Sequence, residues 1–474
     1  MSDDQILRRA SALASQYLAR LDERAVAQPI APEAIRARLG GPVPETGEAP
    51  EAVLEWLARA ADPGLVGSAG PRYYGFVMGG AQPAALAADW LTSAWDQNAG
   101  LFVRSPAAAV AEEVAGGWLA ELLGIPSTAS VGFTSGGTMA NFVALAAARH
   151  ALLARHGWDV EVRGLRDAPP VHVATSDESH PTVFGSLQML GLGRDVAVRI
   201  PTDAQGRMRP EVLVDVLAGL DGPAIVCTQA GNVNSGAFDP FGPIGEAVRR
   251  HRGWLHVDGA IGLWAAAVPS LRHLTLGMAV ADSWTTDAHK WLNVPYDSGV
   301  VFVRDAGAHR AAMSFGGHAS AQVEHVEGGR DAYDWVPESS RRARGFVVLA
   351  ALRALGRDGL VDLIERCCGH ARHMAERLAA SREVEILNDV VLNQVLVRFN
   401  VPDGDLEAGN AFTREVIGRV QADGTCWLGG RTWHGMGAMR VSVTSWNTTT
   451  ADIDRSADAI LRCRDAAARE WPTR

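Results

Sequence analysis

Residues 286–293 read TDAHKWLN and contain Lys290, the only lysine in this chain of 474 residues. The other 43 basic residues are arginines. A primary amine can lose its proton when it is partly desolvated and can then attack a carbonyl carbon, whereas a guanidinium stays protonated and is a poor nucleophile. The alternative is chance in an arginine-rich composition. The chemical difference between the two side chains favours a covalent role for Lys290.

Three further stretches, all upstream of Lys290, pass from an apolar run into polar residues. Residues 131–141, VGFTSGGTMAN, lead from a predicted strand through a turn of Gly, Ser and Thr into an alanine-rich helix, and such a turn can hold a phosphate. Residues 171–180, VHVATSDESH, form a second predicted strand that leads to His180. Residues 254–258, WLHVD, form a third that ends at Asp258. Four predicted strand ends therefore carry, in order, phosphate-binding groups, an imidazole, a carboxylate and an amine.

This ordered set resembles the pyridoxal-phosphate group II amino-acid decarboxylases, the family of aromatic-L-amino-acid and glutamate decarboxylases. The resemblance rests on SGGT at 135–138, the pair Ser179-His180, HVDGA at 256–260 and HKW at 289–291. It extends from about Pro71 to about Arg440. It implies the type I PLP-dependent fold (aspartate aminotransferase-like), bound pyridoxal 5'-phosphate (PLP), and a homodimer with active sites at the subunit interface.

The pattern of apolar residues divides the chain into three regions. Residues 1–85 predict an N-terminal helical segment, which the resemblance places in the dimer packing. Residues 86–355 alternate strands and helices, which predicts a large PLP-binding domain with a mostly parallel sheet and helices on both faces. Residues 356–474 predict a small C-terminal α+β domain. The predicted helices include residues 4–20, 31–39, 49–61, 106–123, 358–381 and 408–422, and the predicted strands 224–227, 254–257, 300–303, 394–399 and 439–444.

Composition argues against several kinds of partner. The formal net charge of −10 gives no basic face, so neither nucleic acid nor an anionic membrane is expected to bind. The first residues, MSDDQ, are acidic where a signal peptide is basic, and no apolar run reaches transmembrane length. The five cysteines are scattered without metal-ligand spacing. We therefore expect reduced thiols, no bound metal and a cytoplasmic enzyme with a small-molecule amino-acid substrate.

The resemblance gives each motif a role. Lys290 is expected to hold PLP covalently, Asp258 to keep the pyridine nitrogen protonated, and His180 to stack on the ring. Ala260 offers the small side chain needed beneath a flat ring. The residues expected to bind the phosphate or help to orient it are Ser135, Gly136, Gly137, Thr138 and His289. Each role has a structural alternative. Lys290 could be a surface lysine, Asp258 an acid in a turn at a strand end, and His180 a capping or core histidine. The turn at 135–138 could be a helix start without a ligand.

Two further positions bear on phosphate and carboxylate binding. Asp287 departs from the family, in which asparagine commonly lies three residues before the lysine. An anion beside a phosphate repels it unless it is turned away, so phosphate contact from this side chain is not expected. Arg440 matches the family arginine that can take the substrate α-carboxylate, and a structural role is its alternative in a chain with 43 arginines.

Glycine pairs at 316–317 and 328–329 bracket a polar segment that leads to Tyr333 and Trp335 and predicts a mobile lid. Tyr333 resembles the lid tyrosine that returns a proton to Cα after carbon dioxide leaves, although it lies two residues before Trp335 where the family alignment gives three. His325 is the alternative donor. A solvated loop is the structural alternative for both.

The resemblance implies decarboxylation of an L-amino acid to the amine and carbon dioxide. Alignment places a mainly apolar set of residues around the substrate side chain, which favours an aromatic or large aliphatic substrate over glutamate. This set comprises Phe76, Val77, Met78 and Trp433, with Asn98, Gly100 and Phe102 from the partner subunit. The alternatives are decarboxylation of glutamate or another small amino acid, decarboxylation-coupled oxidative deamination to an aldehyde, transamination, and a non-catalytic PLP-binding relative.

Overall fold

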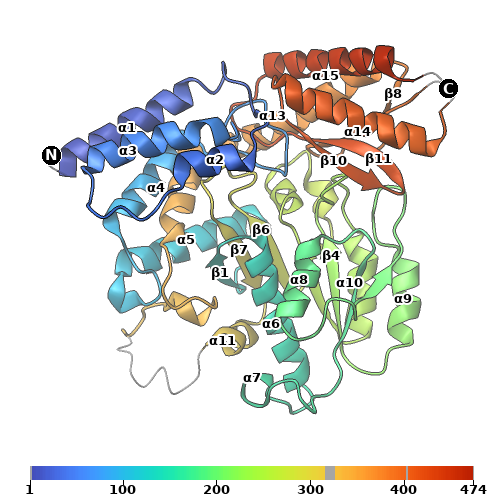
Figure 1. The fold of residues 1–474 in the computed structure, drawn as a ribbon. Coiled ribbons are helices and arrows are strands. Elements are labelled where there is room, and N and C mark those ends of the chain that lie inside the picture. The colour runs from blue at the N-terminus through green and yellow to red at the C-terminus, as the bar shows by residue number, and fades with distance from the viewer. Residues whose placement is uncertain (1–2, 315–325, 402–403, 473–474) are drawn as a thin grey trace. The chain divides into compact units, whose positions relative to one another are not determined.

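The structure is a computed structural model that describes residues 3–314, 326–401 and 404–472. The chain divides into two compact units. Figure 1 labels the helices and strands of both. Unit 1 contains Met1–Gly80, Gly369–Leu387 and Val395–Arg474, and unit 2 contains Ala81–Cys368 and Asn388–Gln394. Within these described ranges, no helix has both the length and the apolar character needed to cross a membrane.

Unit 2 is built on a seven-stranded sheet with the order β1-β7-β6-β5-β4-β2-β3. The strands are β1 (Ser130–Thr134), β2 (His172–Ser176), β3 (Val198–Ile200), β4 (Ala224–Gln229), β5 (Trp254–Asp258), β6 (Ser283–Asp287) and β7 (Gly299–Val303). Neighbours from β6 to β3 pair in parallel, and β7 is antiparallel to both β1 and β6. The carboxyl ends of β1, β2, β4, β5 and β6 therefore lie at one edge, and the predicted mostly parallel sheet is confirmed.

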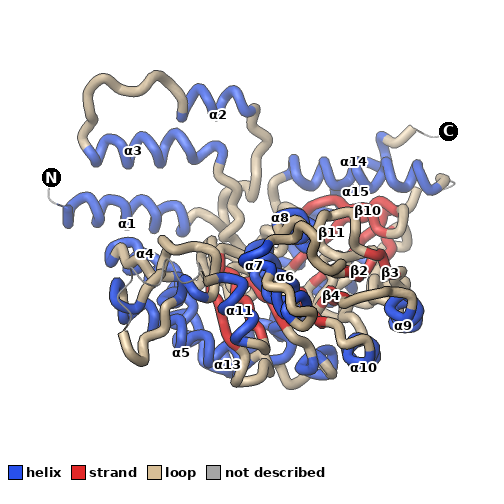
Figure 2. Tube along the Cα trace, turned by 90° about the horizontal axis from the view of Figure 1, so that it is seen from below, coloured by secondary structure: helices blue, strands red, loops and turns tan. Residues whose placement is uncertain are grey.

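Alternation along β5 shows that helices cover both faces of this sheet. Trp254 packs in the core cluster of α6 (Gly137–Ala154), whereas Leu255 faces Gly245 of α10 (Phe241–Arg250). Successive side chains of a strand point to opposite faces, so α6 and α10 lie on opposite sides, as predicted. Figure 2 shows these helices in blue and the strands in red. The other helices of unit 2 include α4 (Pro83–Trp95), α5 (Pro106–Leu122), α7 (Val160–Arg163), α8 (Pro181–Met189), α9 (Pro210–Ala218) and α11 (Ala306–Met313).

Helix α13 (Arg344–Ala379) joins two helical stretches across Gly356, which has φ 61° and ψ −173°. This positive φ favours glycine, because a side chain strains the left-handed region. The second stretch corresponds to the helix predicted at 358–381. The boundary between the two units falls within α13, after Cys368.

Unit 1 combines a small sheet with helices from both ends of the sequence. Its four strands have the order β10-β11-β9-β8, and the pairs β10–β11 and β8–β9 are antiparallel. The strands are β8 (Val384–Ile386), β9 (Gln394–Phe399), β10 (Gly429–Trp433) and β11 (Met436–Ser442). Its complete helices are α1 (Asp3–Ala19), α2 (Pro32–Leu39), α3 (Pro50–Ala61), α14 (Leu406–Asp423) and α15 (Thr450–Glu470).

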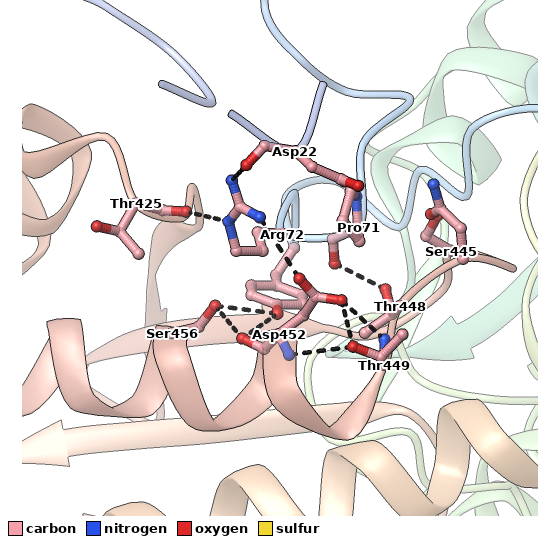
Figure 3. A network of polar contacts seen from close by, with 11 residues as sticks. Asp22, Pro71, Arg72, Thr425, Ser445, Thr448, Thr449, Asp452 and Ser456 are labelled. Carbon is pink, nitrogen blue, oxygen red and sulfur yellow. Dashed lines mark hydrogen bonds and ion pairs between the residues drawn. The ribbon is translucent and has the colours of Figure 1, made fainter. Parts of the chain in front are cut away.

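A buried arginine fastens the early part of unit 1 to its C-terminal part (Figure 3). Arg72 is 2 % exposed and donates to the carbonyls of Asp22 at 2.9 Å and Thr425 at 2.8 Å. It also forms an ion pair with Asp452 at 3.4 Å, in the first turn of α15. Thr449 and Asp452 form a reciprocal capping box on that helix. Because a buried cation needs partners, removal of Asp452 leaves a charge without its counterion in this part of the core.

Candidate active site

One cavity of about 310 Å³ lies at the carboxyl edge of the unit 2 sheet. All nine residues predicted to bind the cofactor line it: Ser135, Gly136, Gly137, Thr138, His180, Asp258, Ala260, His289 and Lys290. They follow β1, β2, β5 and β6, so the parallel arrangement of these strand ends explains why residues up to 155 positions apart in sequence meet.

The turn after β1 presents the start of α6 to this cavity. The N-cap residue of α6 is Gly136, and no side chain caps the first-turn N–H groups. The turn packs closely on β7, because a Cβ on Gly299 of that strand would lie 2.5 Å from the Cα of Gly136. Unsatisfied N–H groups and the helix dipole favour an anion at such a position. This arrangement fits the phosphate of PLP.

Asp258 ends β5 as a carboxylate held through both oxygens. It is 7 % exposed. The backbone N–H of Ala260 donates to Oδ1 at 3.2 Å, and Nδ2 of Asn141 donates to Oδ2 at 3.1 Å. The two contacts therefore give each carboxylate oxygen a hydrogen-bond donor and fix the position of the acid.

Asn141 reaches Asp258 from the first part of α6. Its Oδ1 accepts a hydrogen bond from the Thr285 hydroxyl at 2.8 Å and lies 3.0 Å from His256 Nε2. With the amide oxygen bound to these groups, its NH2 faces Asp258. The network thus determines the orientation of the Asn141 amide.

His256 continues this network into the core of unit 2. Burial lowers its pKa to about 4, so the ring is neutral at neutral pH. Ser283 Oγ accepts from Trp254 Nε1 at 2.9 Å and can therefore donate to His256 Nδ1, also at 2.9 Å. His256 Nε2–H then donates to Asn141. In this series of hydrogen bonds every donor points in the same direction, from Trp254 towards Asp258.

Lys290 lines the cavity and forms an ion pair with a buried acid. Its Nζ is 2.8 Å from Oδ2 of Asp287, whose side chain is 3 % exposed. Asp287 also lines the cavity, and its Oδ1 has no hydrogen-bond partner among the described residues. The amine that was predicted to react with a carbonyl therefore lies beside an acid at the start of α6.

The ring of His289 lies near the other carboxylate oxygen of Asp287 and is held by two contacts of its own. Its Nδ1 accepts the backbone N–H of Ser298 at 3.0 Å, and its ring stacks on Tyr296 with centroids 4.3 Å apart. Burial lowers its pKa, with Asp287 acting in the opposite direction. The imidazole is therefore held neutral, with Nε2–H available to a ligand.

His180 combines two predicted possibilities, because it both caps a helix and lines the cavity. It is the N-cap residue of α8, where its Nδ1 accepts the backbone N–H of Thr182 at 3.4 Å. The Thr182 hydroxyl lies 2.9 Å from the same nitrogen. The capping contacts fix the ring at the cavity wall, so capping and cofactor stacking do not exclude each other.

Three polar residues that line or support the site were not predicted from the sequence. Gln229 and Thr182 line the cavity, and Asn141 supports Asp258 from behind. Gln229 could have been found, since it is the last residue of β4 and polar strand ends supplied the other assignments. Asn141 had a weaker signal, a single amide in an otherwise alanine-rich helix.

Four other predicted residues form a separate group in unit 2, namely Asn98, Gly100, Phe102 and Tyr333. The backbone N–H of Tyr333 donates to the carbonyl of Gly100 at 2.9 Å, and that of Phe102 donates to Asp331 at 2.8 Å. Asn98 Oδ1 accepts from Gly100 N at 3.1 Å. Tyr333 is 6 % exposed, and burial raises the pKa of its phenol. The alternative donor His325 lies outside the described residues.

The remaining predicted substrate residues belong to unit 1. Phe76 and Arg440 line a smaller cavity of about 210 Å³ in that unit, together with Trp427 and Arg431. Phe76 stacks on Trp427 with centroids 5.5 Å apart. Burial, with Arg431 nearby, lowers the pKa of Arg440 to about 10. The structure also places Met78 in unit 1, where it is partly buried.

Phe76 and the residue after it adopt unusual backbone conformations. Phe76 has φ 50° and Val77 has φ 59°. Such conformations cost energy for bulky residues and often occur at binding sites. Here Val77 is buried, whereas Phe76 is 55 % exposed.

Comparison with known proteins shows the family of this chain. A family model described as the pyridoxal-dependent decarboxylase conserved domain matches residues 32–400. The chain is 27% identical to 4-hydroxyphenylacetaldehyde synthase of Rhodiola rosea over 88% of this chain and 85% of that protein. It is 29% identical to L-2,4-diaminobutyrate decarboxylase of Rhizobium meliloti (strain 1021), over 76% of this chain and 71% of that protein. It is 27% identical to aromatic-L-amino-acid decarboxylase of Bacillus atrophaeus, covering 81% and 78%.

Solved structures show the same fold. The crystal structure of Oryza sativa TDC with PLP and tryptamine superposes with a TM-score of 0.89 at 24% identity, covering 98% of this chain and 99% of that one. The crystal structure of mouse CSAD superposes with a TM-score of 0.88 at 25% identity, covering 97% and 98%. The predicted type I PLP-dependent fold is thereby confirmed. Because the family model matches most of the chain, the chain belongs to the pyridoxal-dependent decarboxylase family.

Proposed function

We propose that this protein uses PLP to decarboxylate an L-amino acid with an aromatic or large apolar side chain, giving the amine and carbon dioxide. The observation that carries the proposal is the meeting of Lys290, Asp258, His180 and the start of α6 in one cavity. Together they suit the aldehyde, the pyridine nitrogen, the ring face and the phosphate of the cofactor. Membership of the family supports the same reaction.

PLP supplies an electron sink for the electron pair of the Cα–carboxylate bond when it is bound. Lys290 would hold the cofactor through its amine. Asp258 stabilises a proton on the pyridine nitrogen, because its carboxylate is fixed by Asn141 and by the N–H of Ala260. His180, fixed by its capping contacts, holds the ring face, and the amides of α6 hold the phosphate.

The substrate class is proposed from residues that alignment assigns to substrate binding. Phe76 presents an exposed ring supported by Trp427, which suits contact with an aromatic side chain. Arg440 is a buried cation in the same cavity of unit 1, which suits a carboxylate. Aromatic-L-amino-acid decarboxylase among the relatives supports this class, although L-2,4-diaminobutyrate decarboxylase shows that relatives differ in substrate.

We also propose a homodimer in which each subunit contributes residues to the other's active site. Asn98, Phe102 and Tyr333 lie outside the Lys290 cavity of their own chain but are held together around Gly100 and Asp331. This group suits a role at the site of a partner subunit, as the family resemblance implies. A cytoplasmic location belongs to the same proposal, and five buried free cysteines are compatible with a reducing compartment.

A panel of L-amino acids, assayed for both carbon dioxide and amine, tests the proposed reaction. We expect the highest kcat/KM for an aromatic or large aliphatic substrate, and much lower values for glutamate and 2,4-diaminobutyrate. The matched control is the Phe76→Ala variant, which should lose activity mainly towards aromatic substrates by raising KM. Preference for a charged substrate in the wild-type protein contradicts the proposed substrate class, and bound PLP without turnover on any substrate contradicts the reaction.

Aldehyde formation is the second candidate reaction, because one relative is 4-hydroxyphenylacetaldehyde synthase. We expect Tyr333→Phe to release carbon dioxide but to give less amine per carbon dioxide, with aldehyde, ammonia and peroxide as the diverted products in oxygen. The reason is that phenylalanine lacks the hydroxyl proposed to protonate Cα. Product ratios in air and under nitrogen measure this effect. An unchanged ratio in Tyr333→Phe, together with a changed one in His325→Ala, makes the histidine the donor.

A further inference from the structure

The acid beside Lys290 occupies the region that suits the cofactor phosphate. A Cβ built on Gly137, the first residue of α6, would lie 2.9 Å from Asp287 Oδ2. The Asp287 carboxylate therefore lies against the helix start that favours an anion. Its charge is balanced by Lys290 at 2.8 Å. Attachment of the cofactor to Lys290 engages this amine and brings a phosphate dianion to the same helix start.

We propose that Asp287 and the cofactor phosphate share one proton, taken from solvent when the phosphate binds. A carboxyl group in its protonated form donates a hydrogen bond, as the asparagine amide common at this position in the family can. A buried carboxylate and a phosphate cannot both remain fully charged at close range without a counterion. This inference rests on the proposed placement of PLP, and it makes Asp287 a positioning residue for the phosphate.

The surroundings of Asp287 support the acid as the site of this proton. Oδ1 is buried without a hydrogen-bond partner among the described residues, so the carboxyl has unused hydrogen-bonding capacity. His289, whose Nε2 is 3.6 Å from Oδ1, already accepts the Ser298 N–H at Nδ1 and would lose that contact on protonation. The other titratable groups that face this region among the described residues are Lys290, His180 and Asp258, which line the same cavity, and Asp297 near His289. The start of α6 contributes backbone and no charged side chain.

A four-way binding measurement isolates the proton. The affinities of PLP and of pyridoxal, which lacks the phosphate, are measured for wild-type protein and Asp287→Asn from the absorbance of the lysine-bound form between pH 7.5 and 9. Both ligands attach to the same amine, so the pH dependence of attachment to Lys290 cancels in the ratio of their affinities. In this pH range the free phosphate is already a dianion, because its second pKa is about 6.

In the wild-type protein, the ratio of PLP affinity to pyridoxal affinity should fall as the pH rises, by up to about tenfold per pH unit. This is the dependence expected when binding takes up one proton. In Asp287→Asn this ratio should not change with pH. Infrared difference spectra of the loaded proteins provide a second readout: a protonated-carboxyl band present in the wild type and absent from Asp287→Asn. The control His289→Gln should keep the wild-type pH dependence.

Equal pH dependence in wild type and Asp287→Asn overturns the inference, as does loss of the dependence only in His289→Gln. Failure of PLP to attach to Lys290 is a separate result, because it contradicts the proposed function itself. If the asparagine variant does not fold, the wild-type infrared band and the wild-type affinity ratio still decide the matter. A loaded wild-type protein with no protonated-carboxyl band also overturns the inference.

Discussion

Lys290→Ala will abolish both the visible absorbance of bound PLP and all decarboxylation. The reason is that Lys290 is the only lysine of the chain, so no neighbouring amine can replace it. Absorbance after incubation with PLP and carbon dioxide release measure the two effects. Lys290→Arg is the matched control, because it restores a cation beside Asp287 but cannot form the bond. It should fold with the ion pair and remain inactive.

Borohydride reduction of the loaded wild-type protein gives an independent check on this result. Reduction fixes the pyridoxyl group on its amine, and only Lys290 and the N-terminal amine are available. Peptide mapping should find the label on Lys290. Retained turnover in Lys290→Ala, or a label on neither amine, contradicts the proposed PLP chemistry.

Asp258→Asn is expected to have the second largest effect, slowing decarboxylation by about 10²-fold or more, the scale of a lost preorganised charge in an active site. A neutral amide cannot stabilise a proton on the pyridine nitrogen, so the ring becomes a poor electron sink. Binding of PLP to Lys290 should be largely retained. Single-turnover rates and cofactor absorbance separate these two quantities. Near wild-type activity in Asp258→Asn would mean that the acid is structural.

Asn141→Ala provides the companion variant for Asp258. It leaves the acid in place but removes one of its two donors, and a buried acceptor without its partner costs about 1–3 kcal/mol. The rate should therefore fall less than in Asp258→Asn, by about ten- to a hundredfold if that loss appears in the transition state. Equal losses in both variants contradict a supporting role for Asn141.

The strand ends could be predicted from sequence because local patterns define them. Each apolar run closes on a polar residue, and the parallel sheet then brings Asp258 and Lys290 to one edge. Contacts made through tertiary packing have no such signal. Asn141 is 117 residues from Asp258, and Arg72 is 380 residues from Asp452. These pairs form because α6 packs on the sheet and because the two ends of unit 1 pack together. No local sequence motif encodes either packing.

Position 287 shows a different limit. The sequence revealed an acid where relatives commonly have an amide, and repulsion of a phosphate was the expected consequence. Only the structure reveals that this acid pairs with Lys290 and lies against Gly137. The charge of Asp287 was therefore enough to predict that it repels a phosphate. The ion pair with Lys290 could not be predicted, because it depends on the geometry of the turn after β6.

The one-way order of donors from Trp254 to Asp258 restricts how this protein can evolve. Ser283, His256 and Asn141 each have a fixed donor side and a fixed acceptor side, so reversing one of them forces its neighbours to reverse as well. Single substitutions at Asn141, His256 or Ser283 should be selected against, whereas paired replacements that preserve the order can be accepted. Variant libraries built on this chain should therefore return these three positions as a correlated group.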